Sequence, residues 1–261
     1  PEFVKKAAEN RADEINTCIG CNQACLDHIF VGKTASCLVN PRACHETELV
    51  IEIAAQSKKI AVVGAGPAGL AFATTAAKRG HQVTLFDAAS EIGGQFNIAK
   101  RVPGKEEFYE TIRYFAKQIE LTGVNLQLNT RVSAEMLDNS DFDEVIIATG
   151  ITPRLPEIDG IEHPKVLTYL DVMSGSEVGA KVAVIGAGGI GFDISEVLVH
   201  QGVSTSQNIP AFMKQWGVDM SMTARGGVEQ IEQNFAPAAR EVTLLQRKKT
   251  KVGAGLGKTT G

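Results

Sequence analysis

A glycine-rich turn, set between a short apolar run and a helical run, occurs twice in this sequence. The run IAVVGAGPAGL begins at Ile60, and the run VAVIGAGGIGF begins at Val182. In such a turn the first glycine permits a tight bend, the second lets the backbone approach a pyrophosphate, and the third lets the helix pack on the strand. Since both copies have this context, they predict two dinucleotide-binding units. The glycines concerned are Gly64, Gly66 and Gly69 in the first copy, and Gly186, Gly188 and Gly191 in the second.

The remaining pattern predicts an α/β fold of two Rossmann-like units with parallel sheets, preceded by a small irregular segment rich in cysteine. The polar stretch 201–240 is predicted to be an insertion of mixed helix and loop character. Helices are predicted at 70–79 and 105–121, with one more ending near Val199. Strands are predicted at 60–63, 82–86, 125–128, 144–148, 182–185 and 241–245.

Composition and charge exclude several classes of protein. The net charge of −4 and an isoelectric point near 5.8 give no reason to expect a nucleic acid or an anionic membrane as partner. No apolar run reaches the ~18 residues that a membrane span requires, and the first residues contain no apolar signal region. We therefore expect a cytoplasmic protein. Because the sequence lacks an initiator methionine and stops in a Gly/Lys/Thr loop, we expect it to be a piece of a longer protein.

The two copies differ in the charge that follows their second strand. In the first copy this strand ends at Asp87, where a carboxylate can accept hydrogen bonds from the ribose diol of FAD or NAD. In the second copy the strand is followed by Arg247, Lys248 and Lys249, whose cations suit a 2′-phosphate. The second nucleotide is therefore predicted to be NADP(H). The alternatives are a solvated acid after one strand and a basic surface cluster after the other.

All five cysteines lie before residue 45, which favours metal or redox chemistry in a reducing compartment over a secreted disulfide framework. Four thiolates suit either an iron–sulfur cluster or tetrahedral zinc. His28 and His45 are candidate substitutes in a zinc site, but a packed or solvated histidine is favoured for each. Iron–sulfur is favoured because two redox nucleotide sites follow. Cys44 is left over and is predicted to be a small buried residue. The four candidate metal ligands are Cys18, Cys21, Cys25 and Cys37.

The chain resembles a known family in several stretches: INTCIGCNQACLDHIFVGKTASCLVNPRACHE, IAVVGAGPAGLAFA, VTLFDAASEIGGQFNIAKRVPGKEEF, VAVIGAGGIGFD and LLQRK. These stretches are similar to the C-terminal part of the bacterial NADPH-dependent 2,4-dienoyl-CoA reductases. That family belongs with trimethylamine dehydrogenase among the modular relatives of old yellow enzyme. The resemblance implies glutathione-reductase-like units that bind FAD and NAD(P). The implied domains are an iron–sulfur segment at 1–50, an FAD-binding domain at 51–155 and an NADPH-binding domain at 156–261.

The resemblance also implies cofactor contacts residue by residue. A [4Fe–4S] cluster is implied on Cys18, Cys21, Cys25 and Cys37. For FAD, the implied contacts are Gly66, Pro67 and Ala68 at the pyrophosphate, Asp87 at the ribose, Gly94 and Gln95 near the flavin, Val132 near the adenine, and the turn Ala148, Thr149 and Gly150. For NADPH, they are Gly188, Gly189, Ile190 and Gly191, with Arg247 and Lys248 on the 2′-phosphate.

The implied activity is that of an electron-input module in the β-oxidation of unsaturated acyl-CoA. Electrons are expected to pass from NADPH to FAD, to the cluster and then to FMN in an N-terminal (β/α)8 barrel outside this sequence, where 2,4-dienoyl-CoA is reduced. No catalytic residue is expected in this chain, because the cofactors carry the chemistry. Trimethylamine dehydrogenase and NADH-dependent enoate reductases share the front half of the pattern, but Arg247 and Lys248 favour NADPH. A zinc-containing nucleotide-binding module without electron transfer is a further alternative.

Overall fold

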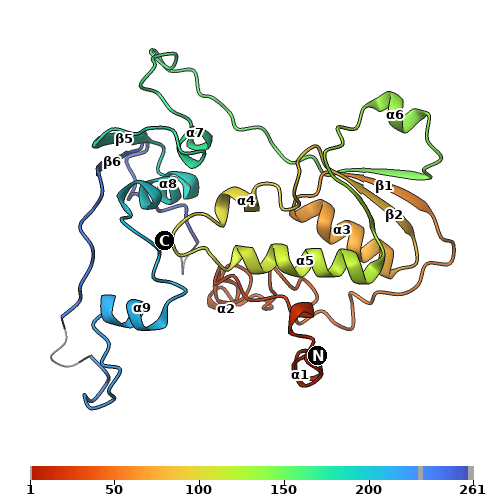
Figure 1. Ribbon diagram of the computed structural model, residues 1–261, viewed down its shortest axis with the longest axis horizontal. Coiled ribbons are helices and arrows are strands. Elements are labelled where there is room, and N and C mark those ends of the chain that lie inside the picture. Colours follow the sequence, from red (N-terminus) through yellow and green to blue (C-terminus); the bar gives the residue numbers. More distant parts are fainter. Residues whose placement is uncertain (1, 229–231, 258–261) are drawn as a thin grey trace. The chain divides into compact units, whose positions relative to one another are not determined.

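The chain divides into two compact units, and the computed structural model describes residues 2–228 and 232–257. Unit 1 comprises Pro1–Lys100 and Glu107–Pro156, and unit 2 comprises Arg101–Glu106 and Glu157–Gly261. The short segment Arg101–Glu106 therefore belongs to unit 2, although parts of unit 1 precede and follow it along the chain (Figure 1).

A four-stranded parallel sheet forms the centre of unit 1. The central strand β1 pairs with β2 on one side and with β4 on the other, which gives the spatial order β3-β2-β1-β4. Because ligands of such sheets bind at the carboxyl ends of the strands, a ligand is expected beside the residues that follow β1, β2 and β4. The strands are β1 (Lys59–Val63), β2 (Gln82–Phe86), β3 (Asn125–Gln127) and β4 (Glu144–Ile147).

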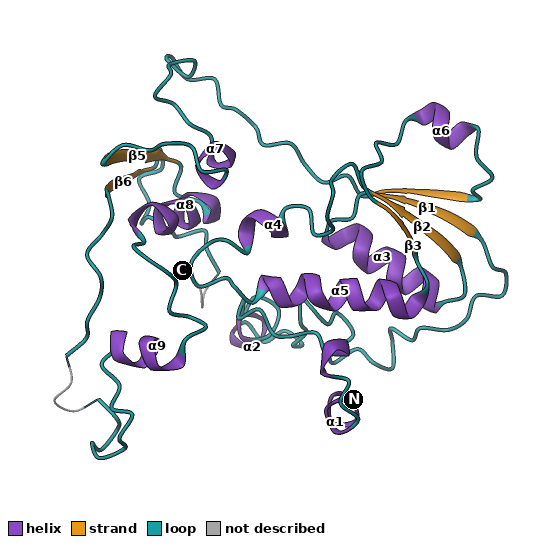
Figure 2. Cartoon of the chain, viewed as in Figure 1, coloured by secondary structure: helices purple, strands orange, loops and turns teal. Residues whose placement is uncertain are grey.

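Two helices, α3 (Pro67–Lys78) and α5 (Phe108–Thr122), lie on the same side of this sheet (Figure 2). Helix α3 packs on β1 and β2, and α5 packs on α3. The largest fully buried side chains come from α3 and the two central strands, and they are Leu70, Leu85 and Val62. Burying such side chains contributes about 1.5–3 kcal/mol each, so this core holds the turn after β1 in place.

Short helices complete unit 1: α1 (Phe3–Ala8), the 3-10 helix η1 (Ala12–Glu14), α2 (Leu26–Phe30), α4 (Phe96–Ala99) and α6 (Ala134–Asp138). None of the residues in α1, η1 and α2 is buried. These three helices therefore owe their position to contacts other than an apolar core.

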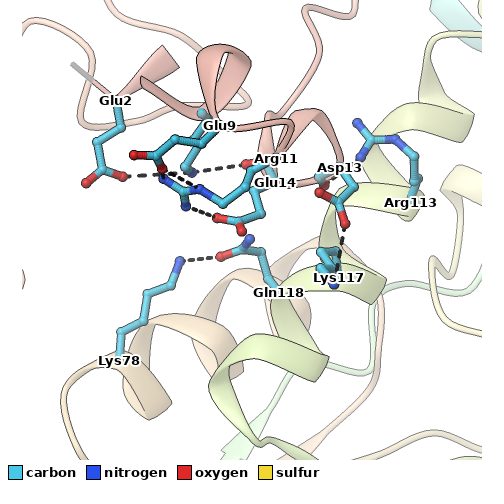
Figure 3. A network of polar contacts seen from close by, with 10 residues as sticks. Glu2, Glu9, Arg11, Asp13, Glu14, Lys78, Arg113, Lys117 and Gln118 are labelled. Atoms are coloured by element: carbon cyan, nitrogen blue, oxygen red, sulfur yellow. Dashed lines mark hydrogen bonds and ion pairs between the residues drawn. The ribbon is translucent and has the colours of Figure 1, made fainter. Parts of the chain in front are cut away.

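Polar side chains fasten the N-terminal segment to α5 (Figure 3). Arg113 of α5 donates to the backbone carbonyls of Asp13, at 2.6 Å, and Ile15, at 2.9 Å. Lys117, one turn further along α5, forms an ion pair with the Asp13 carboxylate at 3.4 Å. Because Asp13 and Ile15 directly precede the cysteines, α5 sets where the cysteine segment begins.

Unit 2 contains a smaller βαβ arrangement. Strands β5 (Lys181–Ile185) and β6 (Glu241–Leu245) form a two-stranded parallel sheet, and helix α8 (Gly189–Val199) packs on both. Helix α7 (Tyr169–Met173) precedes β5, and α9 (Ile209–Gln215) lies in the insertion between α8 and β6. Every helix within the described part of the chain is too short or too polar to span a lipid bilayer.

Most predicted elements are confirmed, and each difference has a physical cause. Helix α3 starts at Pro67 instead of residue 70, because proline suits the first helical turn, where its missing N–H is not needed. Helix α5 starts at Phe108 instead of residue 105, because Arg101–Glu106 is a loop of unit 2. The prediction that Cys44 is buried is wrong: it is exposed and lies in a left-handed turn with φ +63°.

Candidate dinucleotide-binding sites

Of the three fingerprint glycines in the turn after β1, the second, Gly66, is the one with open space beside it. Gly64 bends the chain at φ +109°, in the left-handed region that favours glycine. A Cβ atom on Gly69 would lie well under 3.0 Å from the carbonyl oxygen of Gly64, so α3 crosses the turn too closely for any side chain. Beside Gly66, in contrast, no atom lies within 4 Å of the Cβ position. Tight bend, open approach and close packing are the three features of a pyrophosphate cradle.

The glycine pair after β2 borders the same cradle. Gly93 donates its backbone N–H to the carbonyl of Ala65 at 2.8 Å. A Cβ atom on Gly94 would lie 3.1 Å from the Cα atom of Gly66. Gln95 follows as the exposed N-cap of α4. The structure therefore brings the predicted flavin contact Gly94 next to the predicted pyrophosphate contact Gly66.

The turn after β4 closes the other side of the cradle. Ala148 donates its N–H to the Val63 carbonyl at 2.8 Å, and its own carbonyl oxygen would lie well under 3.0 Å from a Cβ atom on Gly64. Thr149 and Gly150 continue this turn on the surface, and Gly150 has φ +75°. All three residues were predicted to contact FAD, and the sheet places them at the end of the strand beside β1.

Asp87 lies between this cradle and the connection after β3. Its carboxylate accepts the backbone N–H of Ala65 at 2.6 Å and that of Ala89 at 2.8 Å. A carboxylate has about four acceptor sites, so capacity remains for a ribose diol. The backbone carbonyl of Asp87 accepts the N–H of Thr130 at 2.8 Å, and half-buried Val132 lies two residues further on. The predicted ribose and adenine contacts therefore share one edge of the sheet.

The turn after β5 repeats the first cradle in unit 2. Gly186 has φ +118°, and a Cβ atom on Gly191 would again lie well under 3.0 Å from the carbonyl oxygen of that first glycine. No atom lies within 4 Å of the Cβ position of Gly188. Gly189 and Ile190, the first residues of α8, are exposed. Because the first N–H groups of a helix have no partner within it, this end of α8 is suited to an anion.

The basic residues after β6 belong to the same edge of unit 2. The Leu245 carbonyl at the end of β6 accepts the N–H of Gly186 at 2.9 Å, which joins this strand end to the turn. Arg247 and Lys248 follow after Gln246, are exposed, and form no ion pair with a described residue. Their charges are therefore available to a ligand at this strand end.

One ion pair near the second cradle was not predicted from the sequence. Lys105, in the segment Arg101–Glu106, contacts Asp193 of α8 with 2.6 Å between Nζ and Oδ1. Asp193 lies two residues beyond the third glycine of the fingerprint, so its position was visible in the sequence. Its pairing with Lys105 was not visible there, because the two residues are far apart along the chain.

The four candidate metal ligands lie in an irregular segment. Cys18 is exposed, whereas Cys21, Cys25 and Cys37 are half-buried. The backbone N–H of Ser36 donates to the Ala24 carbonyl at 2.6 Å. This hydrogen bond brings the backbone next to Cys37 close to the backbone next to Cys25. Nevertheless, no three His, Cys, Asp or Glu side chains within residues 2–228 and 232–257 are grouped as a metal-ion site.

The surroundings of these cysteines fit an iron–sulfur cluster in their chemistry. Ala24 is the one buried residue between positions 18 and 48, so an apolar core does not order this segment. The backbone N–H of Gly20 points to the Cys18 sulfur at 3.4 Å. Asn16 donates to the Val39 carbonyl at 2.8 Å, while its buried side-chain oxygen has no hydrogen-bond partner among the described residues. Four soft thiol donors in such a segment match the ligands that clusters use.

Residues 58–256 match the protein family described as pyridine nucleotide-disulphide oxidoreductase. The chain belongs to this family. The predicted fold class, an α/β chain with parallel sheets in Rossmann-like FAD/NAD(P)-binding units, is thereby confirmed. The cysteine segment lies outside the matched residues.

Three proteins similar to this chain are much longer. A metal reductase of Desulforamulus reducens is 37% identical over 220 residues, which are 82% of this chain and 33% of the relative. An NADH oxidase of Thermoanaerobacter brockii is 33% identical over 265 residues, which are 99% of this chain and 40% of the relative. A solved structure of 2-naphthoyl-CoA reductase with 2-naphthoyl-CoA has a TM-score of 0.71 and 38% identity, over 74% of this chain and 30% of that one. The chain thus spans about a third of the curated relatives' length.

Proposed function

We propose that this chain is the NADPH-oxidising electron-input part of a 2,4-dienoyl-CoA reductase that acts in the β-oxidation of unsaturated acyl-CoA. One observation carries the proposal: two cradles of the same geometry end in opposite charges, Asp87 in unit 1 and Arg247 with Lys248 in unit 2. A carboxylate selects a ribose with a free diol, and cations select a 2′-phosphate. The two units therefore suit different nucleotides, as a transfer of electrons from NADPH to FAD requires.

In unit 1 the residues would hold FAD by shape and by hydrogen bonds. The backbone at Gly66, Pro67 and Ala68 would face the pyrophosphate, because the space beside Gly66 is open and the first turn of α3 presents free N–H groups. Asp87 would accept the ribose hydroxyls. Gly94 lies against Gly66, so a flavin that extends from the pyrophosphate would pass this turn.

In unit 2 the residues would hold NADPH mainly by charge. The N-terminus of α8 carries a partial positive charge of about half an elementary unit, and Gly188 leaves space for a pyrophosphate beside it. Arg247 and Lys248 would add charge-assisted hydrogen bonds to the 2′-phosphate. NADH lacks this phosphate, so these two residues would discriminate between the two nucleotides.

The cysteines and the substrate complete the proposal. Cys18, Cys21, Cys25 and Cys37 would hold a [4Fe–4S] cluster. When bound, FAD accepts two electrons and such a cluster relays them singly, which suits delivery to FMN in an N-terminal barrel outside this sequence. The dienoyl-CoA substrate class is supported by the similarity of the chain to 2-naphthoyl-CoA reductase, because 2-naphthoyl-CoA, the ligand in that structure, is likewise an acyl thioester of CoA.

A second candidate is a related NAD(P)H:flavin oxidoreductase of the same architecture. It is supported by the NADH oxidase relative, which matches 99% of this chain. Arg247 and Lys248 favour NADPH instead. Trimethylamine dehydrogenase and enoate reductase types fall under this second candidate, and a zinc-containing nucleotide-binding module without electron transfer is the third.

The deciding experiment measures iron, sulfide, zinc and flavin in anaerobically purified protein, followed by titration with NADPH or NADH. We expect about four irons and four sulfides per chain, bound FAD, and bleaching of the flavin absorbance at much lower NADPH than NADH concentration. Cys37→Ser should lose iron, whereas Cys44→Ser should keep it, since Cys44 is left out of the ligand spacing. Zinc in place of iron would overturn the electron-relay proposal, and equal efficiency of the two nucleotides would favour the second candidate.

A further inference from the structure

An acidic residue stands where the proposed nucleotide site of unit 2 needs positive charge. Asp193 is the fifth residue of α8, about 6 Å along the helix axis from Gly189 at a rise of about 1.5 Å per residue. It lies beyond the first turn of α8, where the favourable interaction of a carboxylate with the helix dipole has fallen off. Its negative charge, however, repels the pyrophosphate that the helix N-terminus would bind.

Lys105 neutralises this carboxylate. Its Nζ atom lies 2.6 Å from Oδ1 of Asp193, a short charge-assisted hydrogen bond, and both side chains are about one-third exposed. Lys105 comes from the segment Arg101–Glu106, which belongs to unit 2 although the flanking residues belong to unit 1. The positive charge is therefore brought to the cradle from a remote part of the sequence.

The segment that carries Lys105 is anchored on both sides, so the ion pair is not an accidental contact of two free side chains. Val102 is buried, with only 4% of its surface exposed. The backbone N–H of Lys105 donates to the Val102 carbonyl at 3.0 Å. The next residue, Glu106, accepts the Ser206 hydroxyl at 2.5 Å.

We propose that Lys105 is a further residue of the pyridine-nucleotide site: by pairing with Asp193 it keeps the N-terminus of α8 attractive to the pyrophosphate of NADPH or NADH. This inference rests on the proposed nucleotide site of unit 2. Because the pyrophosphate is common to both nucleotides, Lys105 raises the affinity for both alike. Arg247 and Lys248, in contrast, act on the 2′-phosphate of NADPH alone.

The test measures dissociation constants of NADP⁺ and NAD⁺ for FAD-loaded protein at low and high salt. Lys105→Gln should weaken both nucleotides about three- to sixfold at low salt, the effect of one elementary charge near an anion at a partly aqueous dielectric. The loss should shrink at high salt, because exposed charges are screened. Asp193→Asn should bind at least as tightly as the original protein, and Lys105→Gln combined with Asp193→Asn should restore the original affinity.

A matched control removes the same charge from the far end of the sheet. Lys181 pairs with Glu241 at 3.1 Å where β5 and β6 begin, away from the turn that follows β5. Lys181→Gln should leave both dissociation constants unchanged. The inference is overturned if Lys105→Gln binds normally, or if the double variant stays as weak as Lys105→Gln, since Lys105 would then contact the nucleotide directly. If the original protein binds neither nucleotide, the proposed site of unit 2 fails and the inference fails with it.

Discussion

The strongest test of the cradle in unit 1 is the contrast between two glycine-to-alanine changes in one turn. In Gly69→Ala the new methyl group would lie well under 3.0 Å from the Gly64 carbonyl oxygen, a separation that real Cβ atoms essentially never show. Neither partner is a flexible side chain, so β1 and α3 would have to move apart. Overpacking of this kind costs about 3 kcal/mol or more, which lowers the melting temperature by roughly 6–12 °C in a domain of about 150–250 residues.

Gly66→Ala is the matched control, since it adds the same methyl group three residues away. Gly66 has φ −77° and ψ −179°, which alanine adopts without strain, and no atom lies within 4 Å of the new methyl. Flavin-free Gly66→Ala protein should therefore melt at the original temperature, while its methyl group blocks the space for the pyrophosphate and weakens FAD binding. Calorimetry of flavin-free protein and flavin titration give the two readouts. The reasoning is refuted if Gly69→Ala melts like the original protein, or if both variants lose the same stability.

Three further predictions concern charged residues. Replacing Arg247 and Lys248 together by glutamine should raise the dissociation constant of NADPH about tenfold or more, because hydrogen bonds between charged groups are lost. The dissociation constant of NADH should change little. An equal loss of affinity for both nucleotides in a binding titration would contradict the 2′-phosphate assignment. For Glu106, burial alone would raise its pKa, but hydrogen bonds from Ser204 and Ser206 outweigh it, so that the pKa is lowered. Its folded-state pKa lies below the unfolded value of about 4.3, so its stabilisation is present above that pH and is lost as the pH falls further. Thermal melts between pH 3 and 7 should therefore show a shallower loss in Glu106→Gln than in the original protein, and identical slopes would contradict this. Finally, Arg113→Ala should speed hydrogen exchange or proteolysis near residues 12–17, since two bonds to carbonyls are lost, whereas Arg131→Ala, at an exposed arginine of unit 1, should not.

The parts of the fold that the sequence predicted are those set by local pattern. The apolar run at Ile60 and the run before Gln246 formed strands because each is short, apolar and followed by a turn. The start of the helix predicted at 105–121 was harder to place. Pro103 and Gly104 signal a loop, yet nothing local shows that this loop packs in unit 2, which is why the start of α5 was placed three residues too early.

The residues of the candidate sites likewise fall into those predictable from local sequence pattern and those that depend on tertiary packing. The glycine spacing, with an apolar run before it and a helical run after it, predicted the glycines of both cradles and Asp87, because these residues are close together in sequence. The approach of Gly94 to Gly66 and the pairing of Lys105 with Asp193 depend on tertiary packing, which no short motif contains. The prediction for Cys44 was wrong for a related reason. Cysteine is often buried, but Cys44 lies in an exposed left-handed turn, which its residue type does not reveal.

The loop Arg101–Glu106 has a consequence for how this protein can be recombined. The chain enters unit 2, returns to unit 1 and enters unit 2 again, so a single cut after Pro156 would separate the nucleotide-binding βαβ core from the loop that carries Val102, Lys105 and Glu106. A chimera that takes its second unit from a relative would inherit a mismatched loop unless both segments were exchanged together. Grafting experiments must therefore move two pieces of sequence as one.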